Sequence, residues 1–105
     1  MKKSLLIKFL GDSPVFRIVD FLIENKGLDV TKKQIIDSAN ISRASLFKAW
    51  HQLEEQGIVL ATRQFGKTKL YTLNSKNQLV KKLLELESIL IGKALDNRRL
   101  IQIAH

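Results

Sequence analysis

The sequence predicts a mostly helical α+β domain with a core of three helices, a two-stranded β-hairpin and a long C-terminal helix. Apolar residues recur at three- and four-residue spacing in three segments before residue 57 and in one after residue 78, which is typical of helices with a buried face. In residues 58–73, apolar and polar side chains instead alternate on either side of Gly66, which indicates a hairpin. A chain of 105 residues with 45% hydrophobic content can bury one core but not two.

The first two predicted helices are bounded by capping residues. Ser13 and Pro14 supply an N-cap and a first helical residue, and this helix should end near residues 25–27. Thr31 caps a second, shorter helix, and Asn40 supplies the turn after it. The apolar positions of the two helices are Val15, Phe16, Val19, Leu22 and Ile23, then Ile35, Ile36 and Ala39. Lys32 and Lys33 begin the second helix and oppose its dipole, so we interpret them as phosphate contacts.

A third helix is predicted from Ser42, whose hydroxyl can cap it, to Gln56, followed by Gly57 in a left-handed conformation. The residues expected to point inward are Leu46, Trp50 and Leu53, with Phe47 beside them. The opposite side of the first two turns carries Arg43, Ala44, Ser45, Lys48 and Ala49. Small residues let a helix approach a DNA major groove, where Arg and Lys donate to base edges or phosphates. An ordinary amphipathic helix with a solvated polar face is the alternative interpretation.

The hairpin is predicted from a strand at residues 58–65, a tight turn at residues 66–68 and a returning strand at residues 69–73. Its tip and flanks carry Arg63, Gln64, Lys67 and Lys69. Such a loop could meet a sugar-phosphate backbone or enter a minor groove. Charged strand edges also prevent aggregation, so the hairpin alone is weak evidence.

The net charge of +8 is concentrated in the middle of the chain. Residues 31–82 hold ten of the 18 Lys and Arg residues against three of the ten Asp and Glu residues. A solubilising surface could account for some of these lysines. Their concentration nevertheless favours a polyanionic partner.

The C-terminal quarter carries an apolar stripe that a small domain cannot bury by itself. Its members are Leu79, Leu83, Leu86 and Leu90, with Val80, Leu84 and Ile91 beside them. The stripe either docks on Leu5, Leu6, Phe9 and Leu10 or pairs with the same helix of a second subunit. We favour pairing, and divide the chain into a DNA-binding domain at residues 1–76 and a dimerisation helix with its tail at residues 77–105. The sequence does not indicate what the tail, residues 96–105, packs against.

Other classes of protein are disfavoured by what the sequence lacks. It has no cysteine, no local histidine pair, no glycine-rich phosphate loop and no nucleophile motif. We therefore expect no enzyme activity, no metal site and no cofactor, and we see no small-molecule effector pocket. No apolar run is long enough to span a membrane and no cleavage site follows the basic start, so a cytoplasmic, nucleoid-associated location is expected.

Helix, turn, helix and basic hairpin in this order resemble the winged helix-turn-helix DNA-binding proteins, specifically small archaeal transcription regulators. The resemblance covers roughly residues 10 to 90 and is carried by residues 10–14, 41–43, 50, 53–59 and 66–74. Residues 53–59 match the pattern Leu-Glu-Glu-x-Gly-Ile-Val that joins recognition helix to wing in relatives. The resemblance implies sequence-dependent operator binding. It places Ser42, Arg43, Ser45 and Lys48 at base-facing positions and Lys67 and Lys69 at wing contacts.

The sequence thus predicts a homodimeric transcription regulator that binds double-stranded DNA, with Lys32, Lys33, Arg63, Lys67 and Lys69 on phosphates. Two alternatives remain open. One is a nucleoid-architectural or genome-segregation protein with little sequence preference. The other is a winged-helix adaptor that binds protein.

Overall fold

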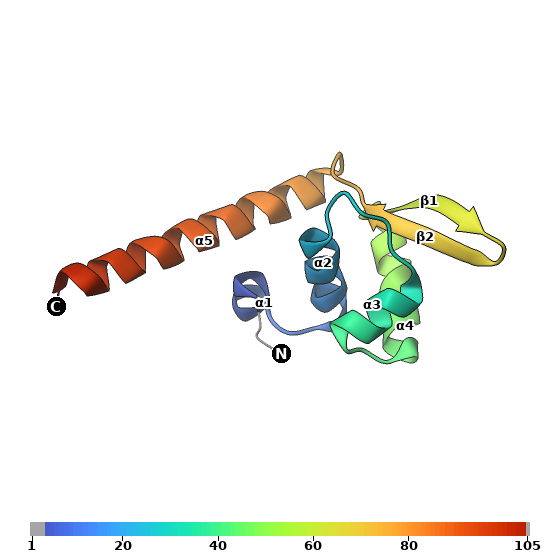
Figure 1. Ribbon diagram of the computed structural model, residues 1–105, viewed down its shortest axis with the longest axis horizontal. Coiled ribbons are helices and arrows are strands. Elements are labelled where there is room, and N and C mark those ends of the chain that lie inside the picture. The colour runs from blue at the N-terminus through green and yellow to red at the C-terminus, as the bar shows by residue number, and fades with distance from the viewer. Residues whose placement is uncertain (1–3, 105) are drawn as a thin grey trace.

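The computed structural model describes the backbone of residues 4–104 and the side chains of residues 4–97. In chain order its elements are α1 (Leu5–Leu10), α2 (Pro14–Glu24), α3 (Lys32–Ala39), α4 (Arg43–Glu55), β1 (Val59–Phe65), β2 (Thr68–Leu73) and α5 (Gln78–Ala104). The three-helix core, the hairpin and the long C-terminal helix predicted from the sequence are all confirmed. The hairpin and the C-terminal end of α5 lie at opposite ends of the molecule, whose longest dimension is 59 Å (Figure 1).

The predicted caps define the ends of α2, α3 and α4. Ser13 Oγ accepts a hydrogen bond from the amide of Phe16, and Thr31 forms a reciprocal capping box with Gln34. Asn40 ends α3 with a φ of 53°, a left-handed conformation that Asn tolerates better than most residues. The tight turn between α3 and α4 therefore follows from local sequence.

One core joins α2, α3, α4, the base of the sheet and the first turn of α5. Its fully buried side chains include Ile18, Leu22, Ile35, Leu46, Leu53 and Val80. Trp50 and Tyr71 meet edge to face, with ring centroids 4.8 Å apart, an arrangement that aromatic quadrupoles favour. Val30, between α2 and α3, forms an isolated bridge with Tyr71, so the sheet is fastened to the helices at its base.

Two positions on α4 differ from the prediction. Phe47 was expected inside and is 54% exposed, whereas Ala49 was expected outside and is 6% exposed. A helix turns about 100° per residue, so Ala49 lies about 60° from Leu46 while Phe47 lies about 100° from it. The buried face of α4 is centred on Leu46, Trp50 and Leu53. It therefore includes Ala49 and leaves Phe47 outside.

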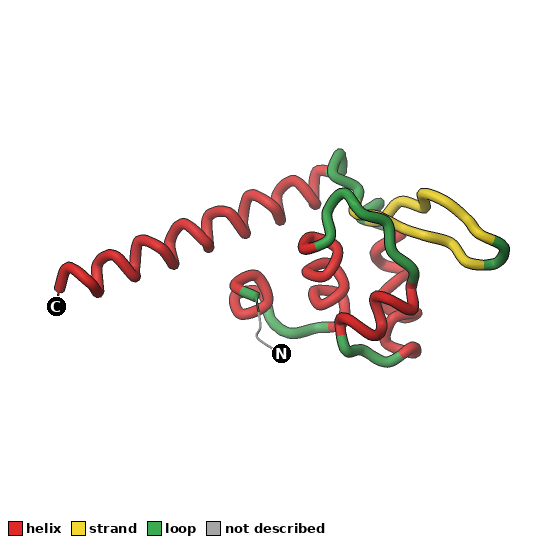
Figure 2. Tube along the Cα trace, viewed as in Figure 1, coloured by secondary structure: helices red, strands yellow, loops and turns green. Residues whose placement is uncertain are grey.

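The hairpin is antiparallel, and its register runs from Val59 opposite Leu73 to Phe65 opposite Thr68. The register shifts between Ala61 and Arg63, where one strand has an extra residue. Only the base of the hairpin is buried, and β1 is exposed from its second residue onward. Figure 2 shows the two strands and their turn projecting from the helical body. The predicted turn is confirmed, except that Thr68 belongs to β2.

Helix α5 leaves the body after its first turns. Val80 is fully buried, and Leu83 and Leu84 pack against the core. Helix α1 lies against α2 and α5, with Leu6 and Ile7 buried. The predicted leucine stripe is therefore divided: Leu83 serves the core, Leu86 and Leu90 are half-buried, and Leu79 is exposed. Side chains of the tail from residue 98 lie outside the described residues.

Considerable apolar surface on these two helices stays uncovered. The large exposed apolar side chains are Leu5 and Phe9 on α1, and Leu79, Ile89, Ile91 and Leu95 on α5. In the described part of the chain, no helix combines the length and apolarity that crossing a membrane requires.

Candidate nucleic-acid interface

Four predicted phosphate-binding lysines gather around one hollow. It measures about 360 Å³, lies between the start of α3 and the hairpin, and is lined by Thr31, Lys32, Lys33, Lys67, Thr68, Lys69 and Tyr71. We call it the lysine hollow. None of the described residues that line it is acidic. The backbone amides in the first turn of α3 point toward the N-terminus of this helix, where the helix dipole is positive. Since the hollow lies at that N-terminus, it suits an anion.

Lys32 has an additional structural role that the sequence did not predict. Its Nζ lies 5.0 Å from the ring centroid of Trp50, 5.4 Å from that of Tyr71 and 5.6 Å from that of Phe47. A cation at these distances is attracted by the aromatic faces. Lys32 therefore links α3 to α4 and β2. The rings come from α4 and β2, which are both distant from Lys32 in sequence, so no local pattern could have indicated this contact.

The N-cap and the first two turns of α4 carry the predicted base-facing residues. Arg43, Ala44 and Lys48 are exposed, and Ser45 is half-buried. Ser42 accepts a hydrogen bond from the amide of Ser45 at 3.0 Å and donates its own proton to the hydroxyl of Ser45 at 2.9 Å. The two serines thus bind each other, and Arg43 and Lys48 are the cations of the first two turns of α4.

Arg63, predicted as a phosphate contact, lies in an ion pair near the middle of β1. Its Nε and Nη2 donate to the two carboxylate oxygens of Asp29 at 2.8 and 3.0 Å, and Thr62 donates to the same carboxylate at 2.8 Å. Hydrogen bonds from Arg63 and then Thr62 lower the pKa of Asp29 to about 2. Arg63 therefore fastens the hairpin to the loop after α2, and its charge is already paired.

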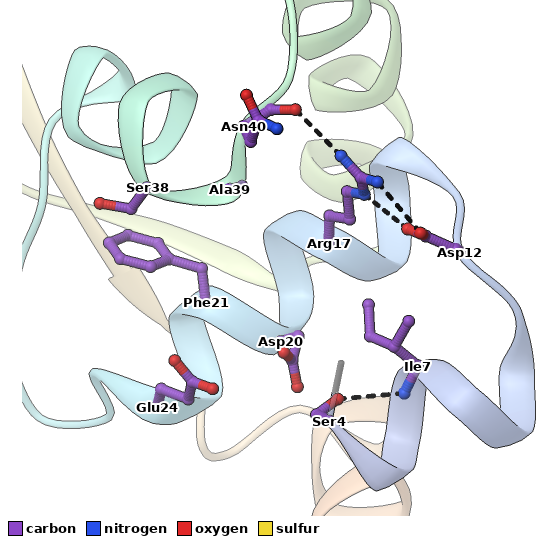
Figure 3. A pocket seen from close by; sticks show the side chains of 10 residues that line it. All are labelled: Ser4, Ile7, Asp12, Arg17, Asp20, Phe21, Glu24, Ser38, Ala39 and Asn40. Atoms are coloured by element: carbon purple, nitrogen blue, oxygen red, sulfur yellow. Dashed lines mark hydrogen bonds and ion pairs between the residues drawn. The ribbon is translucent and has the colours of Figure 1, made fainter. Parts of the chain in front are cut away.

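Arg17 fixes the turn between α3 and α4. Figure 3 shows its guanidinium between the carboxylate of Asp12 and the backbone of Asn40. Nη1 donates to the carbonyl of Asn40 at 2.9 Å. The turn that orients α4 is thus attached to α2 by a side chain that the sequence had not singled out.

A second hollow, of about 300 Å³, lies among α1, α2 and α3 (Figure 3). Asp20, Phe21 and Glu24 are among the residues that line it. No pattern in the sequence indicated this hollow, because its walls come from three helices that are separate along the chain. Nearby, burial and then the charges of Asp20 and Glu24 raise the pKa of Glu87. In the described residues, no group of three or more His, Asp or Glu side chains is placed to hold a metal ion.

Comparison with protein-family models gives no match, and comparison with curated proteins gives none either. Solved structures are similar in fold. NadR in complex with 4-hydroxyphenylacetate aligns with a TM-score of 0.64 and 21% identity, over 93% of this chain and 67% of NadR. ZitR of Lactococcus lactis, a zinc-responsive MarR family member, aligns with a TM-score of 0.55 and 20% identity, over 91% of this chain and 63% of ZitR.

The structure of ZitR in complex with DNA aligns equally well, with a TM-score of 0.55 and 20% identity, over 91% of this chain and 62% of ZitR. The chain thus spans about three fifths of the length of ZitR, and at these identities the likeness concerns the fold. Together with the element order, it shows that this chain has a winged helix-turn-helix fold with a long C-terminal helix, in which β1, β2 and their turn form the wing.

Proposed function

We propose that this chain binds double-stranded DNA and regulates transcription by occupying promoter sequence. The observation that carries the proposal is the lysine hollow, in which Lys32 reaches the ring of Phe47, the neighbour of the exposed Lys48 on α4. The hollow could accept a backbone phosphate while α4 enters the adjacent major groove, as recognition helices do. That one of the similar structures is a complex with DNA supports this assignment.

In this arrangement the two kinds of contact come from different elements. Lys33, Lys67 and Lys69 neutralise phosphates, while Arg43 and Lys48 donate to base edges. Ser42 acts mainly as the cap that orients the first turn of α4, and Ser45 reaches bases only if it gives up its bond to Ser42. Lys32 adds its positive charge to the hollow while its ammonium group stays in contact with the aromatic rings.

The same proposal includes a homodimer formed through α5 and α1. Exposed apolar side chains on these helices, Phe9 at 64% and Leu95 at 51% among them, are the surface that a second copy would bury. A twofold axis between two α5 helices would present two α4 helices to half-sites about 34–36 Å apart. The resemblance to small archaeal regulators and a cytoplasmic, nucleoid-associated location belong to this proposal.

Titration of a 30-base-pair mixed-sequence duplex at several salt concentrations tests the proposal. The triple variant Lys33→Ala, Lys67→Ala and Lys69→Ala should reduce the slope of log affinity against log salt by about one unit for each lysine. Lys8→Ala, which removes an exposed lysine from α1, is the matched control and should leave the slope unchanged. Absence of duplex binding at moderate salt would favour an adaptor that binds protein.

Selection of bound fragments from random DNA separates a regulator from an architectural protein. A regulator should enrich a short palindromic sequence, because a twofold dimer reads two equal half-sites. An architectural protein should enrich no sequence, and its binding should increase with duplex length. Competition by random DNA gives the same distinction.

A further inference from the structure

Phe65 occupies an unusual place for a large apolar side chain. It is the last residue of β1, beside the turn at the tip of the wing, and it is 61% exposed. It takes no part in the hydrophobic core. Stability of the fold therefore does not account for an aromatic ring at this position.

The tip holds the ring in a defined position. The side-chain amide of Gln64 donates to the carbonyl of Gly66 at 2.8 Å, and the backbone of Phe65 pairs with Thr68. The guanidinium of Arg63 lies 5.4 Å from the ring centroid, within the range of a cation–π contact. Because Arg63 is itself bound to Asp29, the ring is connected to the body of the protein.

The surroundings of Phe65 indicate what covers it. Lys67 and Lys69 follow it around the turn and line the lysine hollow, so a partner at this tip meets positive charge close to an apolar ring. The wing lies at the opposite end of the molecule from the free end of α5 (Figure 1), so a second copy docked along α5 leaves the tip uncovered. A polyanion with an apolar interior fits both observations, and duplex DNA is such a partner.

We propose that Phe65 is a wedge that enters the minor groove and partly unstacks one base step. Apolar side chains on narrow elements do this in proteins that kink DNA, by about 20–90°. The inference rests on the proposed DNA binding and adds a deformation of the duplex. Flexible pyrimidine–purine steps would be preferred at the wedge, which gives sequence preference at a position without hydrogen bonds to bases.

The full chain is tested on an end-labelled duplex of mixed sequence that contains TA and CA steps. Resonance energy transfer between its ends reports bending, and permanganate oxidation reports unstacked thymines. Phe65→Ala should bind about tenfold more weakly, as expected for loss of one base–aromatic stack, and should abolish bending and the reactive thymines. Phe65→Leu, which keeps an apolar wedge, should retain most of the bend. Leu28→Ala is the matched control, since Leu28 is 62% exposed and lies outside the wing.

The possible outcomes separate this inference from the proposed function. If the unsubstituted chain binds no duplex, the proposed function fails, and the wedge with it. If it binds but Phe65→Ala keeps full affinity and the same bend, the wedge alone is wrong. A loss of self-association in Phe65→Ala, with DNA binding unchanged, would show that the tip binds protein and would also overturn the wedge. Equal melting temperatures for all variants exclude misfolding as the cause.

Discussion

The two ends of the molecule differ in the chemistry that they leave exposed. At the wing end, Lys33, Lys67 and Lys69 surround a hollow that no described acidic residue lines. At the other end, α1 and α5 expose apolar side chains, and Asp20, Glu24 and Glu87 gather between α2 and α5. The first surface suits a polyanion and the second suits an apolar partner. The fold thus keeps two binding tasks on separate elements, and substitutions should be able to impair one and spare the other.

The largest effect is expected from a charge on α5. Leu90→Glu should separate the dimer, because a carboxylate in an apolar interface costs several kcal/mol. DNA affinity should then fall by about a hundredfold or more, since each half-site would bind independently. Sedimentation equilibrium measures the first effect and a gel shift the second.

Gln78→Glu is the control for this prediction. Gln78 is exposed and polar at the start of α5, so it adds the same charge outside the apolar surface. It should leave the dimer intact. A monomeric Gln78→Glu, or a dimeric Leu90→Glu, would mean that the predicted stripe is not the interface.

A smaller effect is expected at the start of α4. Arg43→Ala should weaken binding to the best selected sequence by about 1–3 kcal/mol and relax base preference, because a donor to a base edge is lost. Fluorescence titration of the selected duplex and of random duplex compares the two affinities. Equal losses on both would identify Arg43 as a phosphate contact.

Removal of one lysine from the hollow should have a smaller and uniform effect. Lys67→Ala should weaken all duplexes alike and reduce the salt slope by about one unit, since it releases one counterion fewer. Titrations at several salt concentrations, with Lys8→Ala as the control, measure the slope. A change in base preference would show that the wing reads sequence through Lys67.

The smallest effect concerns stability at the acidic end. The pKa of Glu87 is raised above its ordinary value by burial and by Asp20 and Glu24, so its charged form is disfavoured in the fold. The unfolded chain loses this proton first, and stability falls as pH rises from the ordinary Glu range, about 4.3, through the raised pKa.

Glu87→Gln should therefore raise the free energy of unfolding at pH 7 by less than about 1 kcal/mol, because the site is partly solvated. Below the ordinary Glu range the substitution should change little. Thermal denaturation at both pH values measures the difference. A variant less stable at pH 7 than the unsubstituted chain would mean that the charged form of Glu87 is stabilised instead.

The parts of the structure that were predicted correctly depend on neighbours in sequence. Ser13, Thr31 and Ser42 cap helices through amides three residues away, and Gly66 permits the turn of the wing. The inner face of α4 was predicted correctly except at its margins, Phe47 and Ala49. The helical period locates the centre of a buried face better than its boundaries. The four lysines of the hollow were identified by charge, although their convergence was not.

The missed features all join residues that are distant along the chain. Arg63 and Asp29 are 34 residues apart, and Arg17 and Asn40 are 23 apart. The three rings around Lys32 come from α4 and β2, and the walls of the second hollow come from three helices. The sequence alone determined the order, the caps and the cationic character of the elements, because these depend on backbone geometry and composition. Only the tertiary structure decided which cations are paired and which stay free, because a side chain meets its partner only after the core has brought separate segments together.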